Sequence, residues 1–172
     1  EITRRIRLGW SAYSKHSQIM TSSLPVSLKR KLYNSCILPL LTYGAETWRP
    51  TKRVLLKLRT TQRAMERKMV RIKLRDRKRA EWVREITQVT DILVEIKKKK
   101  WAWAGRVVRR EDNRWSLRVT NWIPRQGKRS RVRHKIRWSD KVTKFTGVKW
   151  MQLAQNRVNW ENMGEAFALQ WV

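Results

Sequence analysis

The sequence predicts a mainly α-helical fold, and three observations support this prediction. Apolar residues recur at intervals of three and four along several segments, which is the spacing of one helix face. Residue types that begin or end helices flank these segments. No segment sustains the alternation of apolar and polar residues that is typical of a β-strand. The chain has 172 residues, a length that favours about one or two small domains.

The clearest element is a long helix from Thr51 to about Leu74. Thr51 is one of the residue types that cap helix N-termini. The buried stripe advances in steps of three and four and consists of Leu55, Leu58, Gln62, Met65, Met69 and Ile72. Because Arg63, Arg67 and Arg71 recur every four residues, we expect their side chains together on one adjacent basic face.

Other helices are expected on both sides of this one. Pro25 can occupy the first turn of a helix, whereas Pro39 is expected to disturb one. A short helix is expected around Trp82, followed by a helix that Thr90 and Asp91 cap and that runs through Lys97-Lys98-Lys99-Lys100 to Trp103. The last helices are expected to begin at Ser139-Asp140, Trp150 and Asn159, with Gly147 closing the first of the three. Trp82, Trp150 and Trp160 are expected in the core.

Three regions follow from this pattern. Residues 1–110 are expected to form a helical bundle and residues 138–172 a small C-terminal helical region. Residues 111–137 are expected to be a basic, irregular linker, because Pro124 and Gly127 interrupt the segment and six of the ten residues 128–137 are Lys or Arg.

The charge of the chain indicates its kind of partner. Lys and Arg number 42 against 13 Asp and Glu, which gives a formal net charge of +29. Most of the excess lies in residues 49–84 and 101–149, each with 15 basic and 3 acidic residues. A hydrophobic share of 41% favours a folded chain over a disordered basic tail. Two basic blocks on a folded chain favour two contact regions on nucleic acid over a solvated cationic surface without a partner.

Several classes of function are not indicated. Cys36 is the only cysteine and His16 and His134 are the only histidines, so no metal site, and thus no bound metal, is expected. No apolar run approaches the roughly 18 residues of a membrane span, so no membrane partner is expected. The carboxylates are scattered among basic residues, whereas metal-assisted phosphoryl transfer gathers them. No catalytic residue is therefore assigned, and the chain is expected to be inactive alone.

Basic residues interleaved with tryptophan form the positive signal. Cations bind phosphates without sequence preference, and an exposed indole stacks on an unpaired base. Trp101 and Trp103 project from different sides of the expected helix, and the sequence leaves open which of the two is buried. The candidate nucleic-acid-binding residues are Arg63, Arg67, Arg71, Arg75, Arg77, Lys78, Arg79, Lys97, Lys98, Lys99, Lys100, Trp101, Arg129, Arg131, Arg133, Lys135 and Arg137.

A series of short blocks, in order along the chain, resembles the region after the polymerase palm of non-LTR retrotransposon reverse transcriptases. Ile37 to Trp48 resembles the block LPxLxYGxETW, and Arg5-Ile6 with Leu8 to Tyr13 resembles the RIxxGWxAF block before it. The later blocks QRxMER, DRKRxxWIR and KWxWAGH are matched by Gln62 to Arg67, Asp76 to Arg84 and Lys100 to Gly105. Arg137-Trp138-Ser139-Asp140, Trp150 to Ala154 and Trp171 complete the series. RTE-type endonuclease–reverse transcriptases show the greatest similarity.

The resemblance implies a helical thumb in residues 1–110 and a basic C-terminal region beyond it. It also implies that the chain is a piece of a longer RNA-directed DNA polymerase, in which the catalytic carboxylates and their Mg²⁺ belong to a palm domain before Glu1. The expected partners are RNA, DNA or their hybrid and the upstream polymerase domain of the same polyprotein. The expected location is intracellular, in the nucleus, the cytoplasm or both.

The sequence departs from the family pattern at Arg106, where the family has His, and at 131–138, which lacks the family's Gly and Pro. Two alternatives remain beside the polymerase fragment. One is a host-expressed or degenerate retrotransposon-derived protein that binds RNA or DNA without catalysis. The other is an interaction module whose Trp-rich end docks on the polymerase core.

Overall fold

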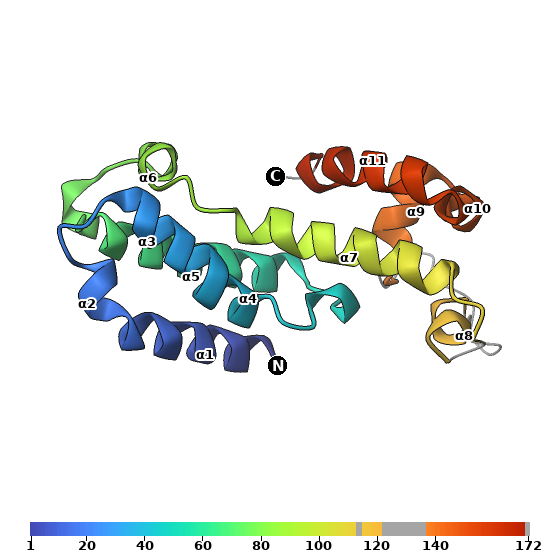
Figure 1. The fold of residues 1–172 in the computed structure, drawn as a ribbon, viewed down its shortest axis with the longest axis horizontal. Helices are drawn as coiled ribbons and strands as arrows, with labels where there is room; N and C mark the ends of the chain where they lie inside the picture. Colours follow the sequence, from blue (N-terminus) through green and yellow to red (C-terminus); the bar gives the residue numbers. More distant parts are fainter. Residues whose placement is uncertain (113–114, 122–136, 171–172) are drawn as a thin grey trace. The chain divides into compact units, whose positions relative to one another are not determined.

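A computed structural model of the chain describes residues 1–112, 115–121 and 137–170, without the side chain of residue 121. In these residues the fold is mainly α and contains no strand, as the sequence predicts (Figure 1). The chain forms two compact units. Unit 1 comprises residues 1–43 and 50–95, and unit 2 comprises residues 44–49 and 96–172. The division falls inside a helix and differs from the predicted one, whose linker at 111–137 lies largely outside the described residues.

Unit 1 is a set of helices around α5. Its elements are α1 (Ile2–Lys15), α2 (Ser17–Met20), α3 (Val26–Leu32), the π-helical turn η1 (Tyr33–Ile37), α4 (Leu38–Leu41), α5 (Lys52–Met69), the 3₁₀ turn η3 (Leu74–Asp76), α6 (Ala80–Thr87) and the first turn of α7 (Ile92–Val108). Large, fully buried side chains from α2, η1, α4 and α5, including Met20, Tyr33, Leu41 and Met65, form its core.

Both prolines lie at helix starts. Pro25 is the N-cap of α3 and not, as predicted, a residue of its first turn, whereas Pro39 lies in the first turn of α4 and disturbs the helix as predicted. Because Pro39 has no N–H to donate to a carbonyl one turn earlier, the chain widens into the π-helical turn before α4 begins.

Helix α5 confirms the predicted cap and most of the predicted stripe. The Thr51 hydroxyl accepts a hydrogen bond from the Val54 N–H at 3.4 Å. Leu58, Gln62, Met65 and Met69 are almost completely buried. Gln62 can be buried among the apolar residues because both of its polar atoms are hydrogen-bonded. Its side chain donates to the Thr90 carbonyl and accepts from the Ile92 N–H, both at 2.8 Å.

The predicted end of this helix at Leu74 is wrong. Helix α5 ends at Met69, and Arg71 has a left-handed backbone with φ of 59°. The buried Lys29 ammonium donates to the Met69 carbonyl at 3.2 Å, which satisfies one of the carbonyls that a helix end leaves open. Arg71 therefore lies beyond the helix and does not continue the row of Arg63 and Arg67; its Nε donates to the Thr21 carbonyl at 2.6 Å.

Unit 2 is built on the remainder of α7. Its other elements are the 3₁₀ turn η2 (Ala45–Thr47), α8 (Trp115–Asn121), α9 (Asp140–Thr146), α10 (Trp150–Gln155) and α11 (Arg157–Leu169). The prediction that the chain is irregular from residue 111 onward is wrong for residues 115–121, because they form α8. Gly147 closes α9 as predicted, with φ of 87°. The last helix is capped by Asn156 rather than Asn159, because the Asn156 side chain accepts from the Asn159 N–H at 3.0 Å.

Two tryptophans hold α7 against α11. The rings of Trp101 and Trp160 stack with centroids 3.8 Å apart, and each indole N–H donates to the other residue's carbonyl, at 2.7 and 3.0 Å. This close approach requires two glycines, since a Cβ at Gly105 would come within 2.6 Å of Trp160 and one at Gly164 within 3.0 Å of Trp101. Trp150 and Trp160 are buried as predicted, whereas Trp82, in unit 1, is 41% exposed and not in the core.

We predict that Met65→Ala lowers the free energy of unfolding by about 2–5 kcal/mol, because it empties a fully buried position of α5. Leu56→Ala, on the same helix but 61% exposed, is the control and is expected to cost far less. Urea unfolding followed by circular dichroism measures both. Equal losses for the two variants would contradict the position of Met65 in the core.

Candidate nucleic-acid interface

The Asp91 carboxylate joins three helices of unit 1. One of its oxygens accepts a hydrogen bond from Arg63 of α5 at 2.9 Å and forms an ion pair with Arg84 of α6 at 3.1 Å. The other accepts from the Leu93 N–H at 2.8 Å and so caps α7, as predicted. Asp91 is 5% exposed, and in this setting its two arginine partners offset the cost of burying its charge.

Arg63 belongs to this buried cluster and not to an exposed face. It is 6% exposed and also pairs with Glu66 at 2.6 Å. Burial raises the pKa of the Glu66 carboxyl, and the charge of Arg63 opposes this rise. The prediction that Arg63 faces solvent beside Arg67 is therefore wrong, because two carboxylates hold its guanidinium inside the unit.

A basic cleft lies between α5 and α6. Its volume is about 310 Å³, and we call it the α5–α6 cleft; it is lined by Leu56, Arg59, Thr60, Arg63, Arg67, Ala80, Glu81 and Arg84. Arg59 is exposed and Arg67 is half-buried. The lining therefore contains four guanidinium groups and one carboxylate, that of Glu81. Two of the four, those of Arg63 and Arg84, also pair with Asp91, which does not line the cleft.

Sequence reasoning missed Arg59 and Arg84 as lining residues of this cleft. The signal for Arg59 was present, since it precedes Arg63 and Arg67 at the same spacing of four. Arg84 carried no such signal, because it reaches the cleft from a different helix.

The segment between α5 and α6 carries four exposed cations of the predicted site. Arg75, Arg77, Lys78 and Arg79 are all exposed. The Asp76 side chain shapes the turn by accepting from the Lys73 N–H at 2.8 Å, and Arg77 has a left-handed backbone. Arg75 lies 3.9 Å from Asp76, a solvent-exposed pair that contributes little stability. The segment leads directly into α6, whose first residues, Ala80 and Glu81, line the α5–α6 cleft.

The basic run on α7 is divided between the core and the surface. Lys97 is buried and donates to the Ala168 carbonyl at 3.0 Å, and Lys100 is buried with its ammonium 4.7 Å from the centre of the Trp138 ring. Trp101 is 3% exposed. The prediction that these three residues contact nucleic acid is wrong, because they form the packing of α7 in unit 2.

The other residues of this run are accessible to different degrees. Lys98 is exposed and lies 3.8 Å from Glu165, whereas Lys99 is half-buried. Arg137 is half-buried, and its backbone N–H donates to Asp140 at 2.6 Å. The predicted residues Arg129, Arg131, Arg133 and Lys135 lie outside the described residues and stay predictions.

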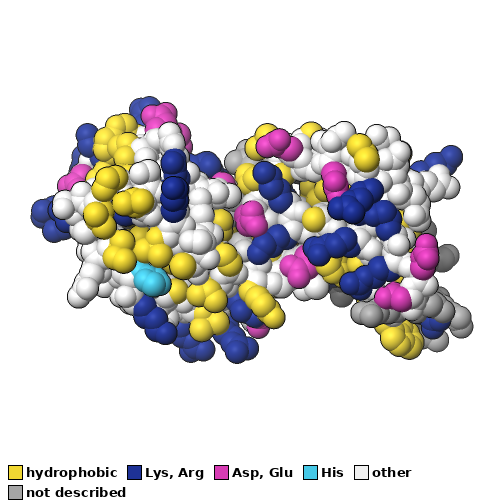
Figure 2. Space-filling view, in the orientation of Figure 1, with side chains coloured by type: hydrophobic (Ala, Val, Ile, Leu, Met, Phe, Trp, Pro, Cys, Tyr) yellow, Lys and Arg dark blue, Asp and Glu magenta, His cyan; other side chains and the backbone are white. Residues whose placement is uncertain are grey.

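Figure 2 shows dark blue Lys and Arg side chains in several groups on the visible face of both units, with magenta carboxylates beside them over α7 and α11. In the described ranges, no three His, Cys, Asp or Glu side chains are grouped closely enough to hold a metal ion. Over the same residues, no helix has the length and apolar character needed to cross a membrane.

We predict that Arg63→Gln destabilises unit 1 by about 3–5 kcal/mol, because it leaves buried carboxylates short of a partner. Arg67→Gln on the same helix is expected to change stability by about 0.5 kcal/mol at most. Urea unfolding of both variants tests the contrast, and a harmless Arg63→Gln would contradict the buried cluster.

A second prediction concerns pH. Burial, with a smaller effect of Lys141, lowers the pKa of Lys100 from 10.5 to about 8. Between these two values the unfolded chain binds more protons than the native chain, so the free energy of unfolding should rise with pH, by at most about 1.4 kcal/mol per pH unit. Unfolding measured from pH 7.5 to 9.0, where tyrosines of ordinary pKa, about 10, are still mostly protonated, should show this rise. Lys100→Met should flatten the profile, and an identical rise in this variant would contradict the assignment.

Comparison with known proteins points to the origin of the chain. No family model and no solved structure matches it. It is 34% identical over 173 residues to a Caenorhabditis elegans protein named as a putative uncharacterized transposon-derived protein. The match covers 93% of this chain and 62% of that protein, so the chain spans less than two thirds of its relative's length. This likeness supports a transposon origin for the chain.

Proposed function

We propose that the chain is a nucleic-acid-binding segment of a non-LTR retrotransposon reverse transcriptase, from the region that follows the polymerase palm. Its role is to bind template–primer or target DNA without catalytic residues of its own, and we call this binding the grip. The observation that carries the proposal is the α5–α6 cleft with the exposed 75–79 segment, where cations outnumber carboxylates.

The arrangement of the acidic side chains supports this role. Asp91 and Glu66 are buried against Arg63 and Arg84, so these carboxylates stabilise the helices and do not neutralise the exposed cations. Arg59, Arg67 and Arg75 are then available to contact phosphates, whose binding releases counterions and is independent of base sequence.

The transposon-derived relative supports a transposon origin for the chain. The reverse-transcriptase part of the proposal rests on the ordered series of blocks that resembles this family across nearly the whole chain. In the proposed context, Mg²⁺ and the catalytic carboxylates belong to the upstream polymerase domain, and the protein acts where retrotransposon RNA and target DNA meet, in the nucleus or the cytoplasm.

A second candidate is a retrotransposon-derived protein that binds RNA or DNA and has no polymerase partner, and the relative's description as transposon-derived is compatible with either candidate. Both candidates use the same basic surface. Primer extension separates them: only the first predicts that adding this chain to its polymerase domain increases synthesis with Mg²⁺.

The binding proposal predicts a strong dependence on salt. If about 6–10 phosphates are contacted, log affinity for duplex DNA should fall against log salt with a slope of about −5 to −9. Replacing Arg59, Arg67 and Arg75 with Gln should make this slope shallower by up to about 2.7, since each phosphate contact contributes about 0.9. Fluorescence anisotropy with a labelled 30-base-pair duplex measures the slope.

The matched control removes three charges elsewhere in unit 1. Arg4, Arg7 and Lys15 are exposed on α1, and their joint replacement with Gln should leave the slope near the parent value. Equal effects of the two triple variants would mean that net charge, and not the α5–α6 cleft, governs binding. A parent slope near zero would refute the grip altogether.

A further inference from the structure

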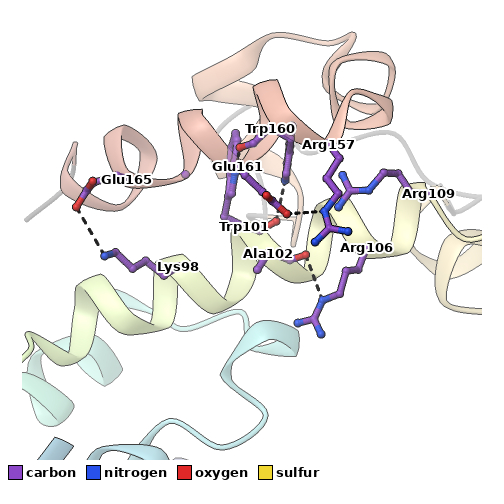
Figure 3. Close-up of a pocket in the computed structure, with 10 residues that line it drawn as sticks. Lys98, Trp101, Ala102, Arg106, Arg109, Arg157, Trp160, Glu161 and Glu165 are labelled. Atoms are coloured by element: carbon purple, nitrogen blue, oxygen red, sulfur yellow. Dashed lines mark hydrogen bonds and ion pairs between the residues drawn. The ribbon is translucent and has the colours of Figure 1, made fainter.

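A second cleft lies within unit 2, between α7 and α11 (Figure 3). Its volume is about 570 Å³, and we call it the α7–α11 cleft. Arg106, Arg109 and Arg157 lie toward one end of it, and the ion pair of Lys98 and Glu165 lies at the other. None of the three arginines is among the candidate nucleic-acid-binding residues of the sequence analysis, although Arg106 is one of the positions at which the sequence departs from the family pattern.

Backbone carbonyls orient two of these arginines. Arg109 Nη1 donates to the Ala154 carbonyl at 2.6 Å, and Arg106 Nε donates to the Ala102 carbonyl at 3.4 Å. A carbonyl fixes the plane of a guanidinium but carries no net charge, and each guanidinium has five N–H groups. The positive charge of both side chains therefore remains to be balanced at this end of the cleft.

The third arginine has a carboxylate partner. Arg157 Nε lies 2.8 Å from Glu161 one turn later on α11. Three guanidinium groups and one carboxylate, that of Glu161, therefore line this end, which leaves an excess of positive charge where the cleft is lined from both helices (Figure 3). Planar forks of this kind match the oxygens of a phosphate group.

Gly105 makes this arrangement possible. A Cβ at this position would lie 2.8 Å from Arg109 Nη1 and 2.6 Å from the Trp160 ring. Glycine inside a helix costs about 1 kcal/mol relative to alanine, and here it lets the guanidinium of Arg109 lie against α7 beside the indole.

The middle of the cleft is apolar. Ala102 and Gly164 line it between the two charged ends, and Trp101 and Trp160, which are 3% and 1% exposed, contribute only ring edges. The cleft therefore combines a site for an anion with an apolar wall of limited length, which is the combination that a phosphate joined to a flat ring requires.

We propose that the α7–α11 cleft binds one nucleotide unit, with its phosphate at Arg106, Arg109 and Arg157 and its base against the apolar wall. This site is separate from the proposed grip of unit 1 and adds recognition of an individual nucleotide to it.

Isothermal titration of the full chain with AMP, adenosine and inorganic phosphate tests the proposal. AMP should bind, and both fragments should bind at least about tenfold more weakly, because each lacks one half of the contacts. Absence of AMP binding would overturn the proposal, and so would equal affinity for AMP and inorganic phosphate, since the apolar wall would then contribute nothing.

Variants locate the site. Arg106→Gln with Arg109→Gln should weaken AMP binding by about tenfold or more. Arg110→Gln, an exposed arginine that follows α7 but does not line the cleft, is the matched control and should have little effect. Glu161→Gln should tighten binding, because it removes the carboxylate that competes for Arg157, and unfolding cannot produce such a gain. Unchanged affinity in both the double variant and Glu161→Gln would overturn the proposal.

Competition identifies the source of the nucleotide. If a 5′-phosphorylated dA decamer displaces AMP but its 5′-hydroxyl form does not, the cleft binds the end of a strand. If both decamers displace AMP, the cleft binds an internal nucleotide. If neither displaces AMP, the cleft binds a free nucleotide. The duplex salt slope is measured separately. A steep salt slope without AMP binding would refute the nucleotide site but not the proposed binding of duplex DNA by unit 1. AMP binding with a flat salt slope would refute the proposed binding of duplex DNA but not the nucleotide site.

Discussion

Unit 1 depends on a single carboxylate. Asp91 binds Arg63 of α5 and Arg84 of α6 and caps the first turn of α7, so that one side chain links three helices. The chain from residue 49 to 84 carries 15 basic and only 3 acidic residues, and repulsion between them opposes a compact arrangement. A buried carboxylate between two guanidinium groups reverses that effect where the helices meet, and it orients the arginines that line the α5–α6 cleft.

The basic residues of this protein consequently have two roles. Some are structural: Arg63 pairs with Glu66 and Asp91, Lys29 closes the end of α5, and Lys97 reaches a carbonyl of α11. Others remain at the surface, around the α5–α6 cleft and on the 75–79 segment. Because so few carboxylates are present and several are buried, the surface retains a large positive excess, and this excess is what the proposed grip on phosphates uses.

The local features of the fold could be predicted from the sequence, and the long-range ones could not. Thr51, Asp91 and Gly147 act at helix ends as their residue types indicate, because a cap depends on neighbours within one turn. Burial depends on distant partners. Trp101 contacts Trp160, 59 residues later, and Lys97 contacts Ala168, 71 residues later. A run of four lysines before a tryptophan therefore suggests a binding surface, although half of it packs inside unit 2, and the α7–α11 cleft had no signal in the sequence.

The division of the arginines into buried and accessible sets is the central claim, and modification with phenylglyoxal tests it most directly. Mass spectrometry of the full chain, free and saturated with duplex DNA, would report each arginine separately. The account predicts that Arg63 is unreactive in both states, whereas Arg59, Arg75, Arg77 and Arg79 react in the free chain and are protected by the duplex. Equal reactivity of Arg63 and Arg59 in the free chain, or no protection of the exposed set by the duplex, would contradict it.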